Sequence, residues 1–339
     1  MIEVRNLNKT YQMGEVEVQA LRNVSLKISP GEFVAIMGPS GSGKSTLMHV
    51  LGLLDRPDSG EYFLAGAEIT KLSDPELALI RNQLVGFVFQ QFHLLPRMTA
   101  LENAELPLIY AGKRHLKEKA EKEIEGVGLK DRMNHRPNEM SGGQQQRVAI
   151  ARSLVNDPPV IFADEPTGNL DSKSKEEIMS IIKELNRKGK TIIVVTHENE
   201  IAAHAKRIIH MRDGEIISDK TVSNEKAAKI NLPDNLIKNI LTKSADAVKS
   251  EIEFFDYLKQ AVSAMLSHKM RAFLSILGIL IGVAAVIAMI ALGRGAQESI
   301  EKQLASLGSN LLLVRPGSPK LQGIAMQSGS TTRFVFQDL

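Results

Sequence analysis

The sequence contains no cysteine and no tryptophan, and aromatic residues make up only 4% of it. Without cysteine, a disulfide framework and a thiolate metal site are both excluded. Residues 1–5 do not combine a basic segment with a following apolar one, so we expect no cleavable secretion signal at this end. The net charge of +3 is small and lacks a long basic run, so we expect no nucleic-acid partner.

Residues 1–222 alternate short apolar runs, rich in β-branched residues, with helical patterns, which is typical of an α/β domain with a largely parallel sheet. The predicted strands are 33–37, 85–89, 160–163 and 191–195. A helix is predicted after Lys44, because apolar residues recur there at helical spacing. The residues of this predicted buried stripe are Leu47, Val50, Leu51 and Leu54. The charged stretch 113–125 predicts an exposed helix.

The composition changes after residue 222. From 223 to 250 the apolar periodicity weakens and polar residues dominate, which predicts a linker. Residues 251–272 then place apolar side chains at roughly helical spacing on a polar background, which predicts an amphipathic helix at a membrane surface. Those apolar side chains are Phe254, Phe255, Leu258, Val262, Met265 and Leu266.

Residues 273–292 contain no ionisable side chain. At about 1.5 Å per residue the run is long enough to cross a hydrocarbon core of about 30 Å, which predicts a transmembrane helix. The alternative is a buried helix of a soluble domain, which seldom needs so long an uncharged run. Because the preceding domain has no signal, we expect it in the cytoplasm and residues 293–339 outside, as the start of a further domain.

A glycine-rich run lies between the first predicted strand and the helix that follows it. The run is Gly38-Pro39-Ser40-Gly41-Ser42-Gly43-Lys44-Ser45-Thr46, which fits the phosphate-loop pattern. The glycines would let backbone N–H groups surround phosphates, Lys44 would add a positive charge, and the Ser45 hydroxyl would bind Mg²⁺. A plain glycine-rich turn is the alternative, but the flanking strand and helix favour a nucleotide. We therefore expect a phosphate-bearing nucleotide and Mg²⁺, and the family resemblance given below implies that the nucleotide is ATP.

Two acidic residues, Asp164 and Glu165, end the predicted strand 160–163. Asp164 would bind the water shell of the metal ion. Glu165, which would point the other way in an extended chain, would polarise the attacking water. Two acids after a strand can also form only a solvated turn or a helix cap, and the phosphate loop earlier in the chain favours the catalytic interpretation.

The run Ser141-Gly142-Gly143-Gln144 immediately precedes a helix-like stretch, 145–154. Ser141 is predicted to cap that helix, and the two glycines would leave backbone amides open to an anion. By itself the run is also compatible with a capping motif that binds no anion.

Taken in order, these motifs resemble those of ATP-binding cassette ATPases. After the phosphate loop come Met140-Ser141-Gly142-Gly143-Gln144, Asp164-Glu165-Pro166-Thr167, Asn169-Leu170-Asp171 and His197. The family usually has Leu where this chain has Met140, a change that conserves volume. The resemblance implies that Gln90 touches the metal or water and faces a membrane domain. It also implies that His197 contacts the γ-phosphate and that Tyr11 stacks on adenine.

The resemblance further implies a homodimer. Two ATPase domains would associate head to tail, so that Ser141 of one chain caps the ATP held by Lys44 of the other. Asp171 would lie in the loop that crosses between the subunits.

Further segments resemble the exporter branch that contains lipoprotein-releasing and macrolide-exporting ATPases. They are residues 87–95, 163–172, 212–214, 269–282 and 291–296. This resemblance implies a cassette fused to a membrane helix and a periplasmic domain. We therefore expect the chain to be part of a longer protein.

The function implied is ATP-driven export of macrolides, peptides or lipoproteins by mechanical transmission. The location would be the inner (cytoplasmic) membrane, with a periplasmic adaptor and an outer-membrane channel as partners. One alternative is a soluble cassette ATPase acting on nucleic acid or ribosomes, although such proteins typically carry paired cassettes or long coiled coils. Another is a module that senses peptide antibiotics.

Overall fold

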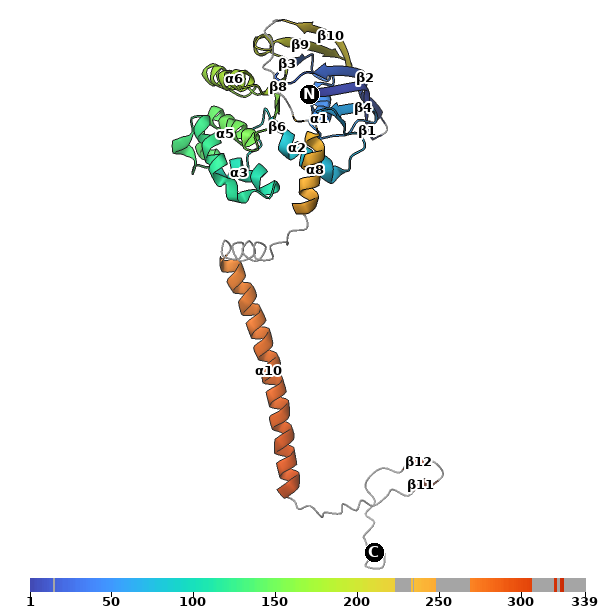
Figure 1. Ribbon diagram of the computed structural model, residues 1–339. Coiled ribbons are helices and arrows are strands. Elements are labelled where there is room, and N and C mark those ends of the chain that lie inside the picture. The colour runs from blue at the N-terminus through green and yellow to red at the C-terminus, as the bar shows by residue number, and fades with distance from the viewer. Residues whose placement is uncertain are drawn as a thin grey trace, which may run out of the picture. The chain divides into compact units, whose positions relative to one another are not determined.

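The computed structural model describes residues 1–14, 16–222, 233, 235–247, 269–306, 320–321 and 324–325. The chain divides into two compact units, Met1–Ser250 and Glu251–Leu339. Their elements are labelled in Figure 1. Most of the predicted amphipathic helix, residues 251–268, lies outside the described residues.

A six-stranded sheet of order β10-β9-β3-β8-β7-β6 forms the centre of the first unit. Its strands are β3 (Phe33–Met37), β6 (Val85–Val88), β7 (Val160–Asp164), β8 (Thr191–Thr196), β9 (Arg207–Arg212) and β10 (Glu215–Thr221). All neighbours pair in parallel except β9 and β10. Strands β3 and β8 are buried along their whole length, which explains their continuous apolar sequences. The predicted α/β fold with a largely parallel sheet is confirmed.

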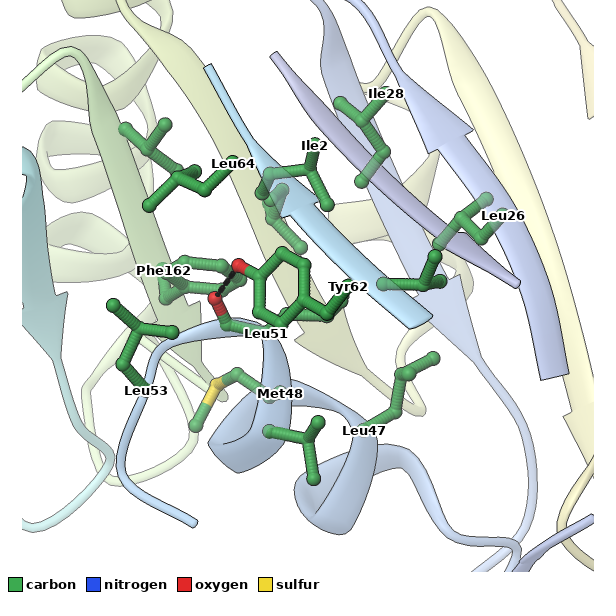
Figure 2. Packing of buried hydrophobic residues seen from close by; sticks show 14 of the residues in the cluster. Ile2, Leu26, Ile28, Leu47, Met48, Leu51, Leu53, Tyr62, Leu64 and Phe162 are labelled. Carbon is green, nitrogen blue, oxygen red and sulfur yellow. Dashed lines mark hydrogen bonds between the residues drawn. The ribbon is translucent and has the colours of Figure 1, made fainter. Parts of the chain in front are cut away.

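A second sheet, which we did not predict, has the order β2-β1-β4-β5 and is antiparallel. Its strands are β1 (Ile2–Met13), β2 (Val16–Ile28), β4 (Ser59–Leu64) and β5 (Ala67–Glu68). In the second half of β2 buried residues alternate with exposed ones, so this sheet has one apolar face. That face packs with part of the first sheet and with helix α1 in one hydrophobic cluster (Figure 2).

Helices cover the sheets of the first unit. They are α1 (Lys44–Leu51), α2 (Asp74–Leu84), α3 (Ala100–Tyr110), α4 (Lys117–Gly126), α5 (Gly142–Leu154), α6 (Ser172–Arg187), α7 (Asn199–Ala202) and α8 (Leu236–Ala247). Helices α3, α4 and α5 pack on one another, and α5 lies against β6 (Figure 1). The predicted exposed helix 113–125 corresponds to α4, which starts later and buries Ala120 and Ile124.

Helix α1 follows the phosphate loop and is held at both ends. Its first turn begins at Gly43, whose carbonyl accepts from the N–H of Leu47. At its last turn the Leu51 carbonyl accepts a hydrogen bond from the Tyr62 hydroxyl of β4 (Figure 2). This bond satisfies a carbonyl that a helix end otherwise leaves without an intrahelical partner. Our inclusion of Leu54 in the buried stripe was wrong, because the helix ends at Leu51 and Leu54 is 44% exposed.

Helix α8 lies within the stretch that we expected to be a linker. Ile237 and Ile240 are only 4% and 5% exposed, and they belong to the same hydrophobic cluster as Leu77 and Ile80 of α2. The expectation of a linker therefore does not hold for these residues. A single apolar stripe at helical spacing is enough to dock a short helix, although polar residues dominate its composition.

The second unit is described mainly by helix α10 (Lys269–Ser306). From Phe273 to Ser306 this helix is long and apolar enough to cross a membrane, and it is the one such helix in the described part of the chain. The predicted span 273–292 is helical, as expected. The helix continues through residues 293–306, which we had assigned to the start of the external domain. Two short strands, β11 (Lys320–Leu321) and β12 (Ile324–Ala325), pair further along.

Candidate active site

The phosphate loop connects β3 to α1, and two of its glycines are required by the close approach of other backbone segments. At Gly38, where φ is +156°, an added Cβ would lie 2.2 Å from the Met211 carbonyl oxygen. At Gly43, where φ is +92°, it would lie 2.4 Å from the Ala20 carbonyl oxygen. Any other residue would push these backbones apart, so the loop keeps its shape only with glycine.

Lys44 is the buried cation of this loop, with an exposed fraction of 8%. Its ammonium group donates hydrogen bonds to the carbonyls of Gly38 at 2.8 Å and Pro39 at 2.7 Å. Burial lowers the pKa of Lys44, while the charges of Glu165 and Asp164 act in the opposite direction. The loop thus encloses a positive charge that faces two carboxylates.

A cleft of about 1000 Å³ opens in front of the loop. The predicted site residues that line it are Ser40, Gly41, Gly43, Lys44, Ser45, Thr46, Gln90, Asp164, Glu165 and His197. The last four lie at or just after the carboxyl ends of β6, β7 and β8, which are neighbours in the parallel sheet. Ligands of parallel α/β sheets bind at this edge. The fold therefore brings together side chains that are more than a hundred residues apart in sequence.

The two acidic residues do not point to opposite sides, as an extended chain would require. Strand β7 ends at Asp164, and Glu165 takes the left-handed conformation with φ +42° while its N–H donates to the Val195 carbonyl at 2.9 Å. This turn places both residues at the cleft. Burial raises the pKa of Asp164, and the neighbouring charge of Glu165 raises it further.

His197 follows β8 and contacts Glu165 directly, with 2.6 Å between its Nδ1 and the carboxylate Oε1. Gln90 follows β6 and lies beside Gly168, where an added Cβ would be 2.7 Å from the Gln90 amide nitrogen. The Gln90 carbonyl accepts from the side chain of Asn169 at 3.3 Å. A carboxylate held by an imidazole, with an amide nearby, can orient and deprotonate a water molecule.

The serine-glycine run lies elsewhere. Ser141 caps α5 as predicted: its hydroxyl accepts from the Gln144 N–H at 3.3 Å, and the Gln144 side chain accepts from the Ser141 N–H at 3.0 Å. Ser141 is exposed and does not line the cleft, and neither do Gly142, Gly143 or Gln144. Within one chain this motif therefore does not meet the phosphate loop.

Asp171 also lies away from the cleft. It caps α6 by accepting from the backbone N–H of Ser174 at 3.0 Å and from its hydroxyl at 2.7 Å. These bonds lower the pKa of Asp171. In this chain its carboxylate is a helix cap at the surface.

Tyr11 does not line the cleft, although Val18, its partner in the β1–β2 register, does. Its hydroxyl donates to Asp55 at 2.6 Å, and the Lys9 ammonium lies 5.2 Å from the centre of its ring. The assignment of Tyr11 to adenine therefore stays a prediction.

Sequence reasoning missed several residues that line the cleft. Four of them come from β2 (Val18, Gln19, Ala20 and Arg22), and others are Asp213 and Gly214 between β9 and β10. No local pattern marks the β2 residues, since they reach the site only through the unpredicted antiparallel sheet.

Two family models match the sequence. The one described as ABC transporter matches residues 21–168, and the one described as MacB-like periplasmic core domain matches residues 272–339. The first interval contains the phosphate loop, the serine-glycine run and both acidic residues.

Proteins named macrolide export ATP-binding/permease protein MacB are similar over the whole chain. The one from Chlorobaculum tepidum is 54% identical over 339 residues, which are 100% of this chain and 51% of that protein. The one from Bdellovibrio bacteriovorus is 52% identical over the same shares. The chain thus spans about half the length of the curated relatives it matches.

Solved structures of the ATP-binding cassette MJ0796 are also similar. A dimer in a post-hydrolysis state with ADP and Pi is 48% identical, with a TM-score of 0.61, and the match covers 66% of this chain and 100% of that one. A second dimeric structure, of the same bacterial ABC transporter cassette, is 49% identical with the same TM-score of 0.61.

Proposed function

This chain belongs to the MacB branch of the ATP-binding cassette transporter family, and from that premise we propose that its first unit binds and hydrolyses ATP to drive export across a membrane. The observation that carries the proposal is the convergence of Lys44, Asp164, Glu165 and His197 on one cleft. A buried cation for phosphates, a carboxylate for a metal ion and a second carboxylate for a water molecule are the parts that nucleotide hydrolysis requires.

We propose that the loop 38–46 holds the phosphates of ATP and that Ser45, Gln90 and Asp164 hold Mg²⁺. Hydroxyl, amide and carboxylate oxygens suit this ion, which binds through one or two carboxylates together with substrate phosphates. Among the described residues, no group of three or more His, Cys, Asp or Glu could hold a metal ion by itself. The proposed ion would be bound jointly by the protein and the phosphates. When bound, the ion would neutralise charge on the phosphates.

Glu165 is proposed as the group that polarises the attacking water. His197 holds its carboxylate at 2.6 Å and would also face the γ-phosphate. The N–H of Glu165 donates to the Val195 carbonyl at 2.9 Å, which ties the backbone of this residue to β8. Tyr11 is proposed for the adenine, next to Val18 at the edge of the cleft.

We propose that two chains complete each site. Ser141, Gly142, Gly143 and Gln144 lie outside the cleft of their own chain, as does Asp171. Ser141 and Asp171 are exposed, Gly142 and Gln144 are half-buried, and Gly143 is buried. In a head-to-tail dimer the first turn of α5 would meet the phosphates held by the partner, with backbone amides and the helix dipole directed at them. The dimeric state of the related cassette structures supports this arrangement.

For the whole transporter we propose macrolides, peptides or lipoproteins as cargo. The cassette, residues 1–222, would lie in the cytoplasm, and α10 would cross the inner (cytoplasmic) membrane toward a periplasmic domain. A periplasmic adaptor and an outer-membrane channel would receive the cargo. Membrane fractionation separates this from a soluble cassette, because a chain anchored by α10 stays in the membrane after washing with salt or carbonate.

The Glu165→Gln variant tests the proposed chemistry. We expect ATP hydrolysis to fall by about 100-fold or more, since the base is lost, while Mg-ATP binding is retained. Steady-state turnover and nucleotide binding would be measured on the same preparation. Glu198→Gln is the matched control, because Glu198 pairs with Lys175 at 2.8 Å and does not line the cleft. Undiminished turnover in Glu165→Gln would refute the role of Glu165.

A further inference from the structure

One buried amide joins the serine-capped helix to two residues beside the cleft. Gln146, in the second turn of α5, is 0% exposed. Its side-chain nitrogen donates to the Pro166 carbonyl at 2.7 Å and to the Phe89 carbonyl at 3.3 Å. Pro166 directly follows Glu165, and Phe89 directly precedes Gln90. Neither acceptor is itself a cleft residue, so Gln146 acts one residue away from each.

Further contacts hold the same segment. Arg152, also on α5, donates to the carbonyls of Phe92 at 2.9 Å and His93 at 2.5 Å. Burial lowers the pKa of Arg152, which remains a cation at any physiological pH. The segment 89–93 is therefore bound to α5 at both of its ends. A displacement of α5 must move Gln90 with it or break these buried bonds.

The N-cap of the same helix is Ser141, at the end nearer to Gln146. In the proposed dimer the first turn of α5 meets the ATP of the partner, while Gln146 contacts the backbone next to Glu165 and Gln90 of its own chain. A helix of this length is a rigid body on the scale of these contacts. It therefore links the nucleotide held by one chain to the machinery of the other.

We propose that Gln146 is a positioning residue that couples the two nucleotide sites of the dimer. When ATP at the partner's site binds Ser141, α5 is drawn toward it, and the amide of Gln146 carries Pro166 and Phe89 along. Glu165 and Gln90 then take their active positions. Occupation of one site thus activates the other, and the coupling is reciprocal, because two identical helices are exchanged by the symmetry of the dimer. The inference rests on the proposed ATPase dimer.

The surroundings of the Gln146 side-chain oxygen show which substitutions at this position test the proposal. The Gln146 oxygen is buried and has no hydrogen-bond partner among the described residues, so the side chain is held only by the bonds that it donates. Gln146→Glu keeps the size but removes both donors and sets an acceptor against two carbonyls. Gln146→Met keeps the approximate volume and removes the polar group.

Asn186 provides a matched control. It is 5% exposed, and its side-chain nitrogen also bridges two carbonyls, those of Gly31 and Lys190, at 2.9 Å each. It lies at the end of α6 and does not line the cleft. Asn186→Leu removes the same kind of buried bridge at a place with no link to the nucleotide.

The test uses the full chain in lipid nanodiscs and measures ATP hydrolysis against ATP concentration, with the Tm of each variant. Wild-type protein is expected to hydrolyse ATP with a Hill coefficient above 1. Gln146→Met and Gln146→Glu are expected to lose about tenfold in kcat and to approach a Hill coefficient of 1, with KM changed less than kcat. Asn186→Leu is expected to lower Tm by a similar amount but to keep the kcat and the Hill coefficient of the wild type.

Three results would overturn the inference: a wild-type Hill coefficient of 1, unchanged kinetics in both Gln146 variants, or the same kinetic loss in Asn186→Leu. The last would show that lost stability, not lost coupling, lowers turnover. A wild-type chain that hydrolyses no ATP would instead contradict the proposed function. The two failures are therefore distinguishable.

Discussion

The phosphate loop and the serine-capped start of α5 are both glycine-rich turns that lead into helices, yet the fold treats them differently. Lys44 is buried and shares a cleft with Asp164, Glu165 and His197, whereas Ser141 is exposed and lines no part of that cleft. One region meets its partners inside the chain. The other lines no part of the cleft of its own chain, and in the proposed dimer it would meet the cleft of the partner.

The difference arises from topology. The carboxyl ends of neighbouring parallel strands open on one edge of the sheet, so residues that follow β6, β7 and β8 must meet there. Helix α5 instead packs with α3 and α4, and its first turn lies beside Phe92 and Leu170, which follow β6 and β7, without lining the cleft. Ser141 therefore caps α5, is held in position by its bonds to Gln144, and stays accessible to a second molecule.

Mixing two inactive variants would separate the two regions most sharply. Lys44→Ala and Ser141→Asp are each expected to reduce ATP hydrolysis by about 100-fold or more. The first variant lacks the cation that binds the phosphates, and the second places a negative charge against them. Asp is a good helix cap, so the second variant should still fold. In a mixed dimer one site combines the intact Lys44 of one chain with the intact Ser141 of the other.

Equal amounts of the two variants, allowed to exchange subunits, are expected to recover about a quarter of the wild-type turnover if the sites act independently, and less if they are coupled. Either variant mixed with itself serves as the control. No recovery above these controls, with exchange demonstrated by labelled subunits, would mean that both motifs serve the same chain.

Asp164 allows a second test, in which stability and activity change in opposite directions. Burial raises the pKa of Asp164 in the folded state, so the folded state binds this proton more tightly than the unfolded state does. The stabilisation that the bound proton gives is lost as pH rises through the folded pKa. At neutral pH without nucleotide, Asp164→Asn is expected to raise Tm by about 2 °C, allowing for partial solvent screening. The variant should lose Mg²⁺-dependent hydrolysis.

The same raised pKa predicts a pH dependence in the wild type. Mg²⁺ requires the ionised carboxylate, so the Mg²⁺ concentration for half-maximal turnover should increase as pH falls from neutral through the folded pKa of Asp164. The increase should begin at a higher pH than an ordinary aspartate, of pKa about 3.9, would give. A requirement for Mg²⁺ that is flat over this interval would contradict the assignment of Asp164.

The smallest expected effect concerns the cap itself. Ser141→Ala removes the bond to the Gln144 N–H and should lower the free energy of unfolding by about 1 kcal/mol, measured by denaturant titration. Ser141→Asp should keep that stability and lose more activity. If Ser141→Ala were both the less stable and the less active of the two variants, capping alone would account for the role of Ser141.

Much of the central sheet follows from local pattern. Continuous apolar runs predicted β3, β6, β7 and β8 to within a residue or so, because strands buried on both faces have no polar alternation. The antiparallel sheet was missed, since its strands alternate, vary in register and bury one face only. Helix α8 was missed because two buried isoleucines decide its place among many polar neighbours.

The sequence by itself determined the phosphate loop, the two acids at the end of β7 and the apolar span of α10, because each depends on residues that are adjacent in the chain. Only the tertiary structure decided that Glu165 turns into the cleft beside Asp164, that β2 forms one wall of it, and that Ser141 stays outside. These outcomes depend on which strand edges and helix ends meet in space. Contacts between distant segments are set by the burial of the whole core, and no local stretch of sequence contains that information.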